Sequence, residues 1–209
     1  IEKFINLALG GILGDVSSYA MDPAQAYRVR SVVESEIAYF GGKVDNIHIF
    51  AHSQGTAITF ETLFTQLEKE DREKIKTYVT IGSILSYYYD TSPILEYSYP
   101  PSRFRMDEYP KFPDDFQWIN CWNLLDPITD FQGLDEFFHE SEVKISPQNI
   151  KTRARSHSDY WGNVEEVHLP FVNRIFGVHD SESFWEKSKE EHNPWKDENT
   201  YGRIILGLF

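Results

Sequence analysis

The chain has little cysteine, a shortage of basic residues and no long apolar run. Cys121 is the only cysteine among 209 residues, which excludes an internal disulfide and a multi-cysteine metal site and fits a reducing, cytoplasmic location. Lys and Arg number 20 against 33 Asp and Glu, a net charge of −13, so nucleic acid is not an expected partner, because phosphate binding needs a positive surface. No run of about 18 apolar residues is present, so we expect no transmembrane segment.

The length and composition predict one domain over residues 1–209. The apolar share of 41% and the charged share of 25% are those of an ordinary globular protein, and no linker or low-complexity tract divides the chain. Because the sequence begins with Ile1 rather than Met, we expect an upstream region of the same protein to precede it.

Hydrophobic spacing predicts alternating helices and strands. A helical lead-in over residues 1–43 ends in a helix that starts at Asp22-Pro23, an N-cap followed by a first-turn proline, and stops at Gly41-Gly42. Further helices are predicted over 56–69 and 169–176, and strands over 44–51, 78–81 and 118–122. This order predicts an α/β fold, a mostly parallel sheet flanked by helices.

The motif richest in chemistry lies between the first predicted strand and its helix. Ala51-His52-Ser53-Gln54-Gly55 places a serine between small residues at a strand-to-helix turn, where a strained bend projects its hydroxyl as a nucleophile. Small residues are expected at 51 and 55 because the chain packs closely there, and the backbone N–H of Gln54 is a candidate oxyanion donor. The alternative is a serine that merely caps the following helix.

A nucleophilic serine needs a base and an acid that orients it. Asp126 follows the predicted strand 118–122 in an Asp-Pro step, at the edge where parallel strands place functional groups; Asp130 and Asp90 are rival acids, and a plain turn is the alternative. Among seven histidines, His157 lies in a polar loop downstream of this acid. The resulting order is Ser53, Asp126, His157, whereas a lone histidine is ordinarily a surface or capping residue.

Four segments, IHIFAHSQGTA, YVTIGS, WINCWNLLDPI and SHSDYW, lie in this order between about residues 44 and 165. In these segments the sequence resembles the α/β-hydrolase superfamily, in particular its lipase- and esterase-like serine hydrolases. The resemblance implies that Ser53 is the nucleophile, His157 the base and then the acid, Asp126 the orienting group and Gln54 an oxyanion donor. It implies cleavage of a small-molecule or lipid ester through an acyl-enzyme, with no metal and no other cofactor.

Two features of this resemblance leave alternatives open. In the superfamily several strands precede the nucleophile strand, so the chain would be a C-terminal portion lacking the first strands, with the second oxyanion donor upstream. The same triad also serves acyltransferases and amidases, and a catalytically inactive α/β-hydrolase-like binding module is a further alternative. The long aromatic loop over 84–116 is either a lid for an acyl group or a proline-stiffened loop that covers the core.

Overall fold

The computed structural model describes residues 19, 22–86, 112–129, 134, 148–152 and 157–176. Most of the predicted lead-in before Asp22 and residues 87–111 of the predicted aromatic loop lie outside the described residues, so neither the lid nor its alternative is tested.

A four-stranded sheet forms the centre of the fold. Its strands are β1 (Ile47–His52), β2 (Ile75–Ile81), β3 (Gln117–Trp122) and β4 (Gln148–Lys151), in the order β1-β2-β3-β4, and all three pairings are parallel. The predicted α/β class with a parallel sheet is thereby confirmed. The predicted limits were less accurate, because β1 starts at Ile47 rather than residue 44 and β2 starts three residues before 78.

The helices follow the predicted pattern with one interruption. Helix α2 (Pro23–Gly41) begins where Asp22 accepts hydrogen bonds from the Ala24 and Gln25 N–H groups. The predicted helix 56–69 is instead divided, and that prediction was wrong: α3 (Gln54–Glu61) passes into a π-helical turn, η1 (Thr62–Gln66), and a separate short helix, α4 (Lys69–Arg72), follows. Leu67 has extended backbone, with ψ 132°, and its buried side chain ends the helical run.

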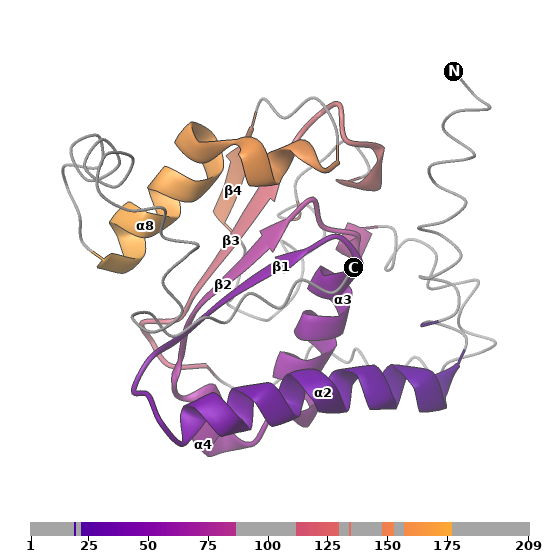
Figure 1. The fold of residues 1–209 in the computed structure, drawn as a ribbon, viewed down its shortest axis with the longest axis vertical. Coiled ribbons are helices and arrows are strands. Elements are labelled where there is room, and N and C mark those ends of the chain that lie inside the picture. The colour runs from indigo at the N-terminus through magenta and orange to yellow at the C-terminus, as the bar shows by residue number, and fades with distance from the viewer. Residues whose placement is uncertain are drawn as a thin grey trace.

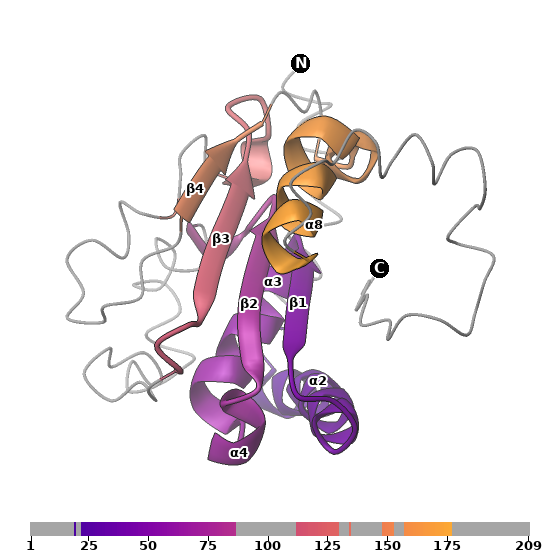
Figure 2. The same ribbon diagram turned by 90° about the vertical axis from the view of Figure 1, so that its left-hand side faces the viewer.

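The sheet lies between two helical layers (Figures 1 and 2). On one face Ile47, Ile49 and Tyr78 pack with α2 and α3. On the other face Val79 and Cys121 belong to a second apolar cluster with η6 (Val164–His168) and α8 (Leu169–Phe176). This alternation follows from the two-residue period of a strand, and burial raises the pKa of the Cys121 thiol to about 12.

The parallel sheet brings three turns together at one edge. Ser53 follows β1, Gly82 follows β2 and the turn Asn123–Asp126 follows β3, and the strands end side by side (Figure 1). None of the described helices is long and apolar enough to cross a membrane.

Candidate active site

Ser53 has a backbone conformation that L-residues rarely adopt. Its φ is 54° and its ψ is −129°, and among the described residues it is the one non-glycine residue with positive φ. The surroundings hold this conformation: its N–H donates to the Ile81 carbonyl at 3.1 Å, and its own carbonyl accepts from the N–H and the hydroxyl of Thr56 at 3.0 and 2.6 Å. Such a residue stores about 1–3 kcal/mol of strain and is concentrated at functional sites.

The serine does not act as a helix cap. It occupies the N-cap position of α3, but its side chain makes no capping hydrogen bond, whereas N-cap serines ordinarily accept one from the first turn. The alternative that Ser53 merely caps the following helix is therefore not supported by the structure. Gln54, the predicted oxyanion donor, is the first residue of α3.

Thr56 joins this turn to the end of β2. Its hydroxyl donates to the Ser53 carbonyl and accepts hydrogen bonds from the Ser83 hydroxyl at 3.0 Å and from the Ile84 N–H at 3.4 Å. One donor and two acceptor positions are all that a hydroxyl offers, so the group is fully used. Its role was not predicted from the sequence.

The predicted small residues of the turn differ in what requires them. Ala51 is buried in β1 among the core residues that face α2 and α3. A Cβ added at Gly55 would meet nothing within 4 Å, so the expected close approach at this position was wrong. The tight contact occurs at Gly82, whose φ is +53° and whose added Cβ would lie 3.0 Å from the His157 ring.

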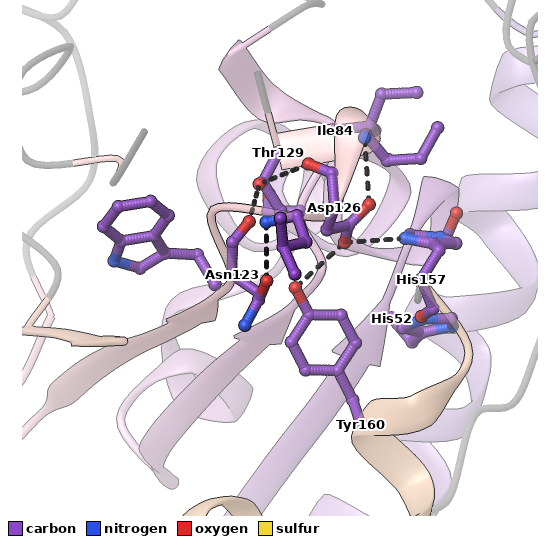
Figure 3. Close-up of polar contacts among 12 residues, drawn as sticks. His52, Ile84, Asn123, Asp126, Thr129, His157 and Tyr160 are labelled. Carbon is purple, nitrogen blue, oxygen red and sulfur yellow. Dashed lines mark hydrogen bonds and ion pairs between the residues drawn. The ribbon is translucent and has the colours of Figure 1, made fainter. Parts of the chain in front are cut away.

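The structure brings Asp126 and His157, the residues predicted as orienting acid and base, into hydrogen-bond contact (Figure 3). The Nδ1–H of His157 donates to Asp126 Oδ2 at 2.9 Å, and this carboxylate is fully buried whereas the His157 side chain is 18% exposed. The other carboxylate oxygen accepts the Ile128 N–H at 2.9 Å. With Nδ1 donating to the carboxylate, a neutral His157 would present the lone pair of Nε2, the arrangement that a general base requires.

Two further side chains hold this pair. The hydroxyl of Tyr160 donates to Asp126 Oδ2 at 2.9 Å. His52 Nε2 lies 2.9 Å from the backbone carbonyl of His157 and must donate, because a carbonyl only accepts. Burial lowers the pKa of His52 below its ordinary value, even though the hydrogen bond to the His157 carbonyl acts in the opposite direction. Neither hydrogen bond was predicted from the sequence, although His52 lies in the turn pentapeptide and Tyr160 in the segment SHSDYW.

Ser53 and His157 lie at the same edge of the sheet, but no hydrogen bond connects them. His52 pairs with Ile81, so Ser53 comes one step after this pair and Gly82 lies beside it in the next strand. The His157 ring lies over Gly82 and stacks on His52, the residue before the serine. However, His157 Nε2 is buried and has no hydrogen-bond partner, so the Ser53–His157 hydrogen bond is not formed; such bonds are often long before substrate binds.

Other sequence candidates have structural roles or lie elsewhere. His48 is half-buried on β1 and pairs with the Thr77 hydroxyl at 3.0 Å, and the rival acids Asp90 and Asp130 lie outside the described residues. Within the described part of the chain, no group of three His, Cys, Asp or Glu side chains could hold a metal ion.

Comparison of the chain with models of protein families, with curated proteins and with solved structures gave no match.

Proposed function

We propose that the chain is a serine hydrolase of the α/β-hydrolase type that cleaves carboxylic esters. The observation that carries the proposal is the strained backbone of Ser53 at the turn between β1 and α3, with a side chain that caps nothing. The hydrogen-bonded Asp126–His157 pair at the same sheet edge supports it, because a serine becomes nucleophilic only beside an oriented base.

In the proposed reaction the Ser53 hydroxyl attacks the acyl carbon of the ester while His157 Nε2 takes its proton. Asp126 holds the ring and stabilises the imidazolium that forms. The Gln54 N–H, at the positive end of α3, stabilises the oxyanion of the tetrahedral intermediate. His157 then protonates the leaving alcohol, and the resulting acyl-enzyme is hydrolysed by a water that His157 deprotonates.

A fluorophosphonate probe tests the nucleophile directly. We expect the folded protein to be labelled once, with labelling abolished by Ser53→Ala and retained by Ser35→Ala, which removes an exposed hydroxyl of α2. Asp126→Asn should lower the rate of ester hydrolysis by about 10⁴-fold, because the ring would lose the acceptor that sets its tautomer. Labelling that survives Ser53→Ala would contradict the proposal.

The acyl group is tested by p-nitrophenyl esters of increasing chain length. Faster cleavage of long-chain esters than of acetate would support a lipase, and the reverse order would support a small-ester esterase. Transfer of the acyl group to an added alcohol, or cleavage of a matched anilide, would identify the acyltransferase or amidase alternatives that share the triad.

One observation favours a second candidate, a catalytically inactive binding module of the same fold. The hydrogen bond that would activate the serine is not formed, and a fold does not guarantee activity. Absence of both labelling and hydrolysis in the full-length, folded protein would favour this candidate over the enzyme.

A further inference from the structure

We propose that Tyr160 is a positioning residue that fixes the Asp126 carboxylate and tunes the basicity of His157. Its hydroxyl and His157 Nδ1 donate to the same oxygen, Asp126 Oδ2, each at 2.9 Å (Figure 3). The expected changes in kcat and kcat/KM rest on the proposed hydrolase function. The expected effect on the protonation of the His157 ring depends only on Asp126, His157 and Tyr160.

The direction of the Tyr160 hydrogen bond is determined by its surroundings. The side chain is fully buried in η5 (Asp159–Gly162), within the apolar cluster below α8. Burial raises the pKa of Tyr160, so its hydroxyl stays protonated. The backbone N–H of Asn123 donates a hydrogen bond to the oxygen of this hydroxyl. The hydroxyl proton is therefore left for Asp126.

This second donor has a predictable effect on the base. The ring of His157 is faced by the Asp126 carboxylate, by Tyr160 and by His52, and Cys121 lies near Tyr160 as a thiol. A hydrogen bond from Tyr160 draws electron density from Oδ2 and holds the carboxylate in one rotation. Without it, more negative charge faces the ring, which favours the protonated imidazole.

Tyr160→Phe removes the hydroxyl and keeps the shape of the side chain. We expect the acidic limb of the pH profile of kcat/KM to move to higher pH by about 0.5 unit. We also expect kcat to fall about tenfold as the carboxylate loses one anchor. KM should be unchanged, because the buried Tyr160 cannot touch substrate.

Tyr19→Phe is the matched control. Tyr19 is also buried, and its hydroxyl also donates to a buried carboxylate, Glu61 Oε2, at 2.7 Å. The bond joins Tyr19, which precedes α2 in the chain, to Glu61 at the end of α3, and it involves neither Asp126 nor His157. This variant should lose stability without any change in the pH profile.

The outcomes separate this proposal from the proposed function. If the wild type hydrolyses esters and Tyr160→Phe shows an unshifted profile, or if Tyr19→Phe shifts it equally, the role of Tyr160 is overturned. If the wild type hydrolyses nothing, the function fails and an NMR titration of the His157 ring decides. A titration displaced to higher pH in Tyr160→Phe then supports the proposal, and an unchanged titration overturns it.

Should Tyr160→Phe not fold, the Tyr160 hydroxyl proton is followed by NMR in the wild type. A chemical shift of this proton that changes as His157 titrates supports the proposal. A chemical shift that stays constant through the titration overturns the proposal.

Discussion

The rings of His52 and His157 are stacked, with centroids 4.6 Å apart and planes inclined by 26°. The same His52 side chain bonds the His157 carbonyl through Nε2. The residue before the candidate nucleophile therefore contacts the candidate base through both its ring and its hydrogen bond, across 105 positions of sequence.

His52→Ala should lower kcat/KM for p-nitrophenyl acetate by about two- to tenfold, because one net hydrogen bond is worth about 0.5–1.5 kcal/mol. His52→Gln should recover most of this loss, since its amide N–H can reach the same carbonyl, whereas His52→Phe keeps a ring without a donor and should not. Equal rates in the Ala, Gln and Phe variants would show that the contact does not position His157.

Ser53→Gly should give a more stable protein than Ser53→Ala by about 1 kcal/mol, because glycine adopts positive φ without strain. The matched pair is Ser35→Gly and Ser35→Ala on α2, where glycine should be the less stable by about 0.5–1 kcal/mol. Urea unfolding of the four variants measures both differences. If the glycine variant were less stable than the alanine variant at position 53, as it is expected to be at position 35, the result would argue against stored strain at Ser53.

Gly82→Ala should destabilise the protein by at least about 2 kcal/mol and impair hydrolysis. A methyl group there would press on the His157 and Tyr160 rings, each 3.0 Å away, at a backbone conformation unfavourable to alanine. Gly55→Ala is the contrasting variant and should gain about 0.5–1 kcal/mol, since it lies in α3 with open space around it. Thermal unfolding compares the two, and a tolerated Gly82→Ala would contradict the close approach.

The stability should fall as the pH falls below about 6.5, the ordinary pKa of histidine. Burial lowers the pKa of His48 and of His52, and nearby Lys76 adds to the effect on His48. The folded state therefore binds protons less readily than the unfolded state, so unfolding takes up protons and becomes easier in acid. Urea unfolding at pH 7.5 and 5.5 should show this loss in the wild type and a smaller one in a His48→Gln, His52→Gln variant. An identical loss would assign the effect to other groups.

The sequence was most informative where the structure depends on neighbouring residues. The turn at Ser53 could be predicted because a β-branched strand, a small-residue pentapeptide and an apolar helix pattern follow one another directly. Asp126 and His157 could be paired only through the order of the motifs. β4 was missed because its four residues, QNIK, contain a single apolar side chain.

Contacts between distant segments could not be predicted in the same way. Gly82 looked like the end of a strand, and only the folded chain places it beneath a ring 75 positions later. Tyr160 lies in the segment SHSDYW beside His157, but its hydrogen-bond partner Asp126 is 34 residues away in the sequence. The break at Leu67 likewise depends on where its side chain finds the core, which a helical pattern alone does not encode.

The hydroxyl of Thr56 makes the backbone of Ser53 mechanically dependent on the chain that leaves β2. The group that supports the serine carbonyl also binds Ser83 and Ile84, and it has no bonding capacity to spare. A displacement of the chain at Ile84 would thus be transmitted to the peptide plane of the candidate nucleophile through a single oxygen atom.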